Sequence, residues 1–247
     1  MLLGSLKTSA ELFIVPVVWL PQKGFQFVNY ARAWTAMQVP VHFLNSSFVA
    51  IVRVAFELFF ASLAGFGFAK YHFPAKHFIF TFLLCTIMIP FQIIMIPLFI
   101  IIRELGLIDS LYGVTLPALV SAFGVFVMRQ FIITIPDEYL DAARIDGSGE
   151  LGILFRVILP SCRPAIATLG ILTFLSSWND LLWPLIVLTK EELYTLPLML
   201  ARFQSDYHVV YNQLMSAATV ICIPILCTYL FFQRYFVQGV ALSGLKG

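Results

Sequence analysis

Long apolar runs recur along this chain and restrict its fold more than any other feature. An α-helix needs about 20 mostly apolar residues to cross a bilayer. Runs of that length span residues 48–69, 78–102, 111–135, 164–188 and 214–236. With 60% hydrophobic and 11% charged residues, the composition also lies outside that of soluble domains. The sequence therefore predicts an all-α integral membrane protein with a bundle of five transmembrane helices.

Residues 1–47 contain no run of that length. The best candidate, 12–20, is interrupted by Pro16 and is much shorter than a span. We therefore expect residues 1–47 to form an extracytoplasmic N-terminal segment and residues 48–236 to form the transmembrane domain, followed by a tail at 237–247.

Positive charge in the short loops predicts the orientation, because cytoplasmic loops are enriched in Lys and Arg. One side of the membrane holds the larger group, which is Lys70, Lys76, Arg129, Arg144, Arg156, Arg163, Arg234 and Lys246. The other side holds Arg103, Lys190 and Arg202, leaving aside the N-terminal segment. This imbalance places the polar loop 136–160 and the tail 237–247 in the cytoplasm of a multi-pass plasma membrane protein.

The loop 136–160 is polar but is patterned as a helix. Asp137 can cap the N-terminus, and acidic residues fill the first turn, where the helix dipole favours negative charge. Arg144 supplies positive charge in the last turn, and Gly147 supplies a left-handed stop. The sequence therefore predicts a short helix over 137–146.

One face of this short helix would carry Tyr139, Ala142 and Ala143, and the two alanines would let another backbone approach closely. A helix of about 14 Å is marginal alone and needs a partner. After Gly149 an apolar stripe at helical spacing predicts a second helix that ends at Pro160. The stripe consists of Leu151, Leu154, Phe155 and Ile158.

The order D-A-A-x-x-D-G from Asp141 to Gly147, followed by I-L-P, resembles the EAA loop of ABC-transporter permeases. In detail it is similar to maltose-type permeases of bacterial carbohydrate importers, where this loop docks in a cleft of the ATPase subunit. Asp141 stands where the family name has Glu and reaches one methylene less far. The alternative is an amphipathic interfacial hairpin without a partner. The docking positions that the resemblance implies are Glu138, Asp141, Ala142, Ala143, Asp146 and Gly147.

The resemblance extends over almost the whole chain and implies an architecture with partners. The texts SLKT and NYARAW resemble the external segment that follows the family's first span, and the ending LSGLKG resembles the family's tail. The family usually has six spans, so its first helix is absent here, which we interpret as a misplaced start. The implied partners are a second homologous permease subunit, an ABC ATPase dimer, an extracytoplasmic solute-binding protein and membrane lipid.

Polar residues at membrane depth are candidates for the translocation path. An ionised side chain there costs roughly 3 kcal/mol on insertion scales, so Asp180 is expected to face protein or a water-filled path. The text SWNDLLWPL resembles the family's fifth helix, which lines that path, and this implies Trp178, Asn179 and Asp180. Gln92, between two prolines of the second run, is a further candidate. The alternative for each is a hydrogen bond that joins two helices.

Several classes of function are disfavoured by the sequence. The net charge of +2 is too small to indicate nucleic-acid binding, and the sequence has no Gly-Lys pair for a phosphate-binding loop. No nucleophile triad or paired-carboxylate site is recognisable, and histidines such as His208 lack metal-ligand spacing. We therefore expect no cofactor, no metal and no enzymatic activity in this chain. The cysteines also lack ligand spacing, and they are Cys85, Cys162, Cys222 and Cys227.

The leading hypothesis is a permease subunit of an ATP-driven importer for a sugar or oligosaccharide. One alternative is a permease of the same architecture for a polyol or a glycerol phosphate ester. Another is an ion-coupled secondary transporter, which usually shows inverted repeats and several intramembrane carboxylates. Only Glu57 and Asp180 lie well inside the apolar runs, and no internal repeat is found, so this alternative is weaker.

Overall fold

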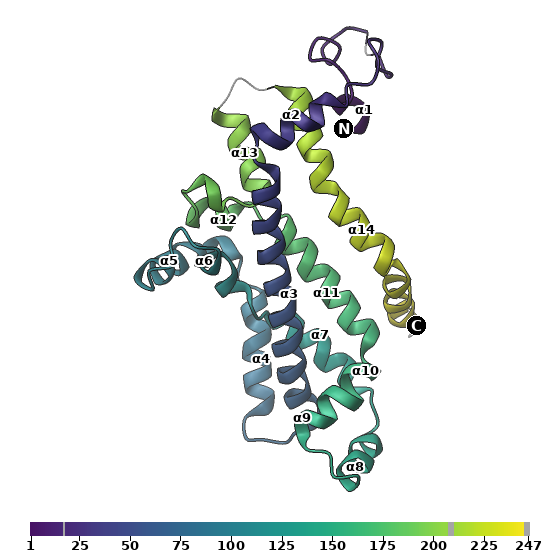
Figure 1. Cartoon of the computed structure of the whole chain (residues 1–247). Helices are drawn as coiled ribbons and strands as arrows, with labels where there is room; N and C mark the ends of the chain where they lie inside the picture. Colours follow the sequence, from purple (N-terminus) through teal and green to yellow (C-terminus); the bar gives the residue numbers. More distant parts are fainter. Residues whose placement is uncertain (17, 207–209, 245–247) are drawn as a thin grey trace. The chain divides into compact units, whose positions relative to one another are not determined.

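The computed structural model describes residues 1–16, 18–206 and 210–244, apart from the side chains of 205, 206 and 232–244, and these residues contain helices and no strand (Figure 1). His208 lies outside the described residues. The chain divides into two compact units. Unit 1 comprises Met1–Val49, Leu107–Val114 and Ser177–Leu230, and unit 2 comprises Ala50–Gly106, Thr115–Ser176 and Phe231–Gly247.

Unit 2 contains the loop 136–160 and the helices around it. They are most of α3 (Val39–Lys70), α4 (Lys76–Ile87), α5 (Phe91–Glu104), η1 (Leu116–Ala118), α7 (Ala122–Ile133), α8 (Asp137–Ile145), α9 (Glu150–Ile153), the π-turn η2 (Leu154–Ile158), α10 (Leu159–Ser161) and most of α11 (Arg163–Trp178). Unit 1 contains α1 (Leu2–Ser5), α2 (Val28–Ala36), the start of α3, α6 (Leu111–Thr115), α12 (Leu182–Val187), η3 (Glu191–Leu193), α13 (Leu196–Asp206) and the first part of α14 (Tyr211–Gly244).

Among the described residues, two helices are individually long and apolar enough to cross a membrane. They are α3, with 32 residues, and the stretch Tyr211–Phe231 of α14, with 21 residues. Three bent helix pairs pass the same test together, so the described chain has up to five spans. The helix that contains the first apolar run begins at Val39, before residue 48. The last helix continues past residue 236 to Gly244, so most of the expected tail is helical.

Prolines explain the breaks in the bent pairs, since proline lacks an amide hydrogen and disfavours a helical residue before it. The pair α4 and α5 bends by 99° just before Pro90. The pair α6–η1 and α7 bends by 44° past Pro117, where the Ser121 hydroxyl caps α7 by accepting from the Gly124 amide at 2.9 Å.

The core of unit 2 forms where α3 and α7 meet the segment that follows α8. The two helices approach closely at Gly65, where a Cβ would lie 2.8 Å from Cβ of Met128 and 2.9 Å from the backbone nitrogen of Arg129. Leu140 attaches α8 to this core. The core residues are Ala61, Phe66, Val125, Met128, Ile132, Leu140, Ile153, Leu154, Ile158, Cys162, Ala165 and Leu169.

The apolar stripe predicted after Gly149 is only half buried. Leu154 and Ile158 are core residues, whereas Leu151 and Phe155 are exposed. A π-turn occupies Leu154–Ile158, and such a turn shifts the facing of side chains relative to a regular α-helix. Two of the four stripe residues therefore face the core and two face outward.

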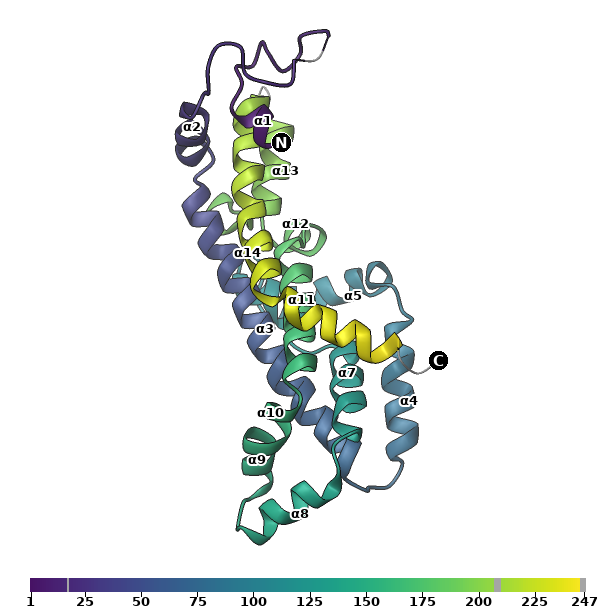
Figure 2. The same cartoon turned by 90° about the vertical axis from the view of Figure 1, so that its right-hand side faces the viewer.

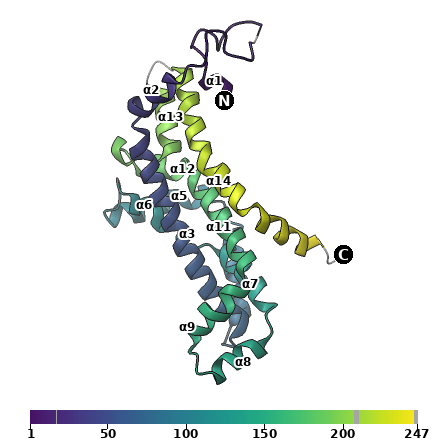
Figure 3. The ribbon, with the colours of Figure 1, turned by 45° about the vertical axis from the view of Figure 1, so that its right-hand side comes forward.

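In unit 1 the N-terminal segment folds against the start of α14 (Figure 3). The Asn29 side chain donates to the carbonyls of Ser5 and Lys7 at 2.8 and 2.9 Å, and it accepts from the Asn212 amide at 3.0 Å. The Glu11 carboxylate accepts from the backbone amides of Thr8, Gln22 and Lys23 at 2.8–3.0 Å. These hydrogen bonds give the segment a defined structure without a membrane-length helix.

Candidate functional site in the loop helix and the broken fourth span

The predicted short helix is present as α8, which begins at Asp137 and ends at Ile145. Its N-cap is Pro136, and the Asp137 carboxylate does not cap it. That carboxylate instead accepts from Nζ of Lys70 at 2.6 Å, and this hydrogen bond holds the pKa of Asp137 below its usual value. The prediction of an aspartate N-cap was therefore wrong by one residue, because a tertiary ion pair uses the side chain.

The C-terminal turn of α8 agrees with the prediction for Gly147, whose φ is +80°. The Ser148 amide donates to the Ala143 carbonyl at 2.9 Å, and the Gly147 amide donates to the Arg144 carbonyl at 3.0 Å. This is the Schellman arrangement, which needs a residue in the left-handed region. Gly147 therefore sets where α8 ends.

The outward face of α8 differs in one residue from the predicted face. Tyr139 and Ala142 are exposed, and Tyr139 retains 62% of its accessible surface. Ile145, which the sequence analysis did not single out, retains 86%. Ala143 is half-buried and packs on the core beside Leu140, which retains 2%. The accessible apolar face is therefore Tyr139, Ala142 and Ile145, called the outer face below.

Charged residues lie beside the outer face. Glu138, Asp141 and Asp146 are exposed, and the Asp141 carboxylate accepts from Arg144 at 2.9 Å. Figures 1 and 2 both show α8 at one end of unit 2, beyond the C-terminal end of α3. The helix thus presents an exposed apolar strip with an acidic border.

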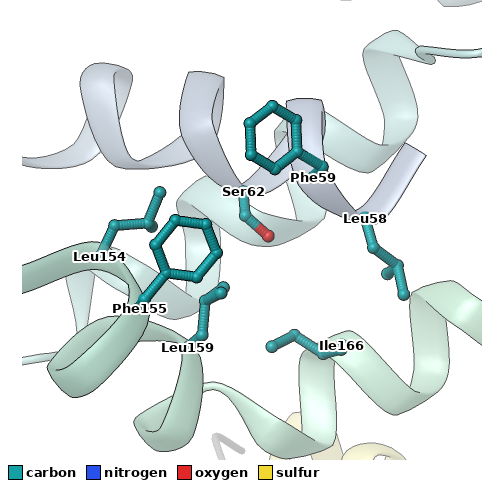
Figure 4. Close-up of a pocket in the computed structure, with 7 residues that line it drawn as sticks. All are labelled: Leu58, Phe59, Ser62, Leu154, Phe155, Leu159 and Ile166. Carbon is teal, nitrogen blue, oxygen red and sulfur yellow. The ribbon is translucent and has the colours of Figure 1, made fainter. Parts of the chain in front are cut away.

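A small apolar pocket of about 210 Å³ lies in unit 2 between α3 and the segments after α9 (Figure 4). The Ser62 hydroxyl points into it and makes no hydrogen bond to any described atom. The rings of Phe59 and Phe155 stack beside it with centroids 6.4 Å apart. None of the lining residues belongs to α8, so the pocket is separate from the outer face. They are Leu58, Phe59, Ser62, Leu154, Phe155, Leu159 and Ile166.

The sequence predicts one helix over the fourth apolar run, and this prediction was wrong. In the structure α11 ends at Trp178 and α12 begins at Leu182. Pro184 has no amide hydrogen to donate to the carbonyl of Asp180, four residues earlier. The Asp180 carboxylate instead accepts from the Trp183 amide at 3.5 Å, at the start of α12. The run is therefore interrupted at Asn179.

Around this break the predicted path residues have different environments. Trp178 is buried, and its indole donates to the Ile221 carbonyl at 3.1 Å. Asn179 is exposed and Asp180 is half-buried. Gln92 is exposed on α5 and belongs to unit 2, whereas the other three belong to unit 1. The structure therefore gives Trp178 a packing role and leaves polar atoms of Asn179 at the surface of unit 1.

A clip next to α12 was not foreseen from the sequence. The Asp109 carboxylate accepts from the amide and the hydroxyl of Thr189 at 2.5 and 2.7 Å, and from the Lys190 amide at 3.1 Å. The Asp109 amide donates to the Val187 carbonyl at 3.0 Å. The hydrogen bonds from Thr189 lower the pKa of Asp109. Asp109 adopts a φ of +53°.

The residues that hold α8 in place were also missed. Lys70 was used in the sequence analysis only as a loop charge, and Tyr71 and Glu150 were not singled out, because their contacts join parts of the chain that are distant in sequence. In the part of the chain that the structure describes, no three His, Cys, Asp or Glu side chains are placed to hold a metal ion.

Residues 58–242 match the family described as binding-protein-dependent transport system inner membrane component. Over its whole length the chain is 40% identical to the arabinooligosaccharides transport system permease protein AraQ of Bacillus subtilis, of which it covers 89%. It is 33% identical, over 81% of its length and 72% of the relative, to the sn-glycerol-3-phosphate transport system permease protein UgpE of Pectobacterium atrosepticum.

A solved structure is similar as well. It is the crystal structure of a bacterial ABC transporter involved in the import of the acidic polysaccharide alginate. One chain of it superimposes with a TM-score of 0.84 at 26% sequence identity, covering 95% of this chain and 88% of that chain.

Proposed function

The chain belongs to the family of binding-protein-dependent inner membrane components and is a multi-pass permease subunit of an ABC importer, and from this premise we propose that its solute is an oligosaccharide. Two similar proteins support that class, since one is named for arabinooligosaccharides and the other for alginate, a polysaccharide. The competing solute is a glycerol phosphate ester, which is supported by the similarity to UgpE.

The proposed coupling site is α8. Its outer face exposes Tyr139, Ala142 and Ile145, and a nine-residue helix of this kind is marginal without a partner. We assign that face to a groove of an ATPase subunit, with the exposed Glu138, Asp141 and Asp146 at its border. A second permease subunit and an extracytoplasmic solute-binding protein complete the proposed importer. ATP-driven closure of the ATPase dimer would then move α8.

The proposed path includes the break in the fourth span. Non-helical backbone at membrane depth is tolerated only where it is buried in protein or faces water. The exposed amide of Asn179 and the half-buried carboxylate of Asp180 offer the donor and acceptor groups that sugar hydroxyls require. Trp178 would position them through its bond to Ile221.

Replacement of Ala142 with glutamate tests the docking role. Ala142 is exposed, so the variant should insert and fold, but a charge on the outer face should prevent retention of the ATPase subunits. Co-purification and solute-stimulated ATP hydrolysis are the readouts. Ala36→Glu, at an exposed alanine of α2, is the matched control for co-purification. An Ala142→Glu complex that keeps both properties would contradict the docking role.

The solute is tested by uptake in proteoliposomes that hold the complete importer and its binding protein. Labelled arabinooligosaccharide should be taken up in an ATP-dependent manner, and labelled glycerol 3-phosphate should not. Uptake of glycerol 3-phosphate alone would overturn the assignment of the solute and leave the coupling role of α8 intact.

A further inference from the structure

Two residues at the end of α3 hold both ends of α8. Lys70 is the last residue of α3, and Tyr71 follows it directly. Lys70 contacts the N-terminal end of α8 through Asp137. Tyr71 contacts the C-terminal end through Glu150, which pairs with Arg144. The 67 and 79 residues that separate these partners in sequence make the contacts tertiary.

The Lys70 contact lies at the junction of α7 and α8. The Lys70 side chain retains only 8% of its accessible surface, and its ammonium donates to the carboxylate of Asp137 and to the carbonyl of Ile135. Carbonyls that follow a helix attract cations, and an acid in the first turn of the next helix is favoured as well. One ammonium therefore connects the end of α7 and the start of α8 to the end of α3.

The Tyr71 contact lies at the junction of α8 and α9. The Tyr71 hydroxyl donates to Glu150, and the same carboxylate accepts from Nε of Arg144 at 3.1 Å. Burial, together with Glu150, raises the pKa of Tyr71 to about 12, so the hydroxyl remains a donor at any physiological pH. The Tyr71 carbonyl accepts from Lys76 at 2.8 Å, which fixes the backbone of the donor.

We infer that Lys70 and Tyr71 are positioning residues that transmit displacement of α8 directly to α3. Without them, α8 would act on the span helices through the packing of Leu140 in the core and through its covalent neighbours, and both neighbouring connections turn sharply, one before Pro136 and one at Gly147. With them, a displacement enters a helix that is continuous for 32 residues. This inference rests on the proposed docking of α8 and adds the route by which the motion leaves it.

The test uses the complete importer in lipid with Lys70→Met and Tyr71→Phe combined. The Met side chain keeps the apolar stem of Lys70, and Phe keeps the ring of Tyr71. The readout is the number of solute molecules transported per ATP hydrolysed, because a variant that is only less stable lowers the amount of complex and not this ratio. Mutations on a coupling route change coupling by roughly 2- to 30-fold, and a fall in that range is expected. Lys70→Arg, which keeps the cation, should retain most of the ratio.

A distance measurement detects the connection itself. Gly67→Cys in α3 and Gly149→Cys after α8 can carry spin labels, since a Cβ at either position meets no atom within 4 Å. In a chain whose native cysteines are first replaced with alanine, the label distance should be the same with and without ATP, because the two segments move together. In the Lys70→Met, Tyr71→Phe chain the distance should change when ATP binds.

The outcomes separate the two proposals. If Ala142→Glu releases the ATPase but the double variant keeps its transport ratio and its constant label distance, the connection through α3 is wrong and the docking role stands. If Ala142→Glu has no effect, the docking role is wrong. A fall in the ratio together with a change in the label distance supports the connection.

Discussion

Replacing Gly147 with alanine measures how strongly the C-terminal turn of α8 supports coupling. A Cβ at Gly147 would meet no atom within 4 Å, so the substitution introduces no clash. Its whole effect comes from the backbone, because φ is +80° and an L-residue in the left-handed region costs about 1–2 kcal/mol. A change of that size lowers the ratio of capped to open turn by about 5- to 30-fold.

Hydrogen exchange is the assay for this prediction. The amides of Asp146, Gly147 and Ser148 form the last bonds of the turn, and in Gly147→Ala they should exchange about 5- to 30-fold faster, in proportion to the population of the open turn. Solute-stimulated ATP hydrolysis of the assembled importer should fall in parallel. Gly147→Asn should lose less, since asparagine tolerates the left-handed region.

Gly149→Ala is the matched control, because Gly149 has a φ of −73° and equally open surroundings. It should behave as the unmodified chain in both assays. If Gly147→Ala also kept its exchange rates and its stimulated hydrolysis, the turn would have no role in holding α8 for docking. Equal losses in both variants would show that flexibility of the whole connection matters and that the left-handed turn does not.

Two further predictions concern the packing of unit 2 and the N-terminal segment. Gly65→Ala should lower the free energy of unfolding by about 1–3 kcal/mol, since its Cβ would lie 2.8 Å from that of Met128. The control Gly67→Ala meets no atom and should not lower it. Thermal unfolding in detergent compares the two variants, and equal midpoints would refute the close approach. Hydrogen bonds, first among them that from the Thr8 amide, lower the pKa of Glu11 to about 2. Because this pKa is depressed, the stabilisation is fully present above the ordinary value of 4.5 and is lost as the pH falls through about 2. Limited proteolysis of residues 1–47 should therefore be slow at about pH 5 and fast near pH 2, and Glu11→Gln should abolish the difference.

The parts of the site that follow from local signals could be predicted from the sequence. The short helix and its stop at Gly147 depend on nearby charges and on one glycine, and both are present as expected. The face of α8 was only partly predictable. Helical spacing puts Ala142 and Ala143 side by side, but the anchoring of Leu140 in the core turns Ala143 inward and leaves Ile145 exposed.

The remaining features depend on contacts that are distant in sequence or on competition between signals. No local pattern joins Lys70 to Asp137 or Asn29 to Asn212, because these pairs are defined only once the helices pack. The break after Trp178 was hidden because apolar residues resume directly after Asp180, and because proline is tolerated within many spans.

The hydrogen bonds of Asp109 with Thr189 and Lys190 imply that selection acts unequally on these residues. Lys190 contributes its backbone amide, so its side chain can change freely during evolution without loss of that bond. Asp109 must satisfy two conditions, an acceptor for Thr189 and a positive φ, and asparagine is the substitute that meets both. We expect homologous permeases to keep Asp or Asn at this position, while the residue equivalent to Lys190 drifts.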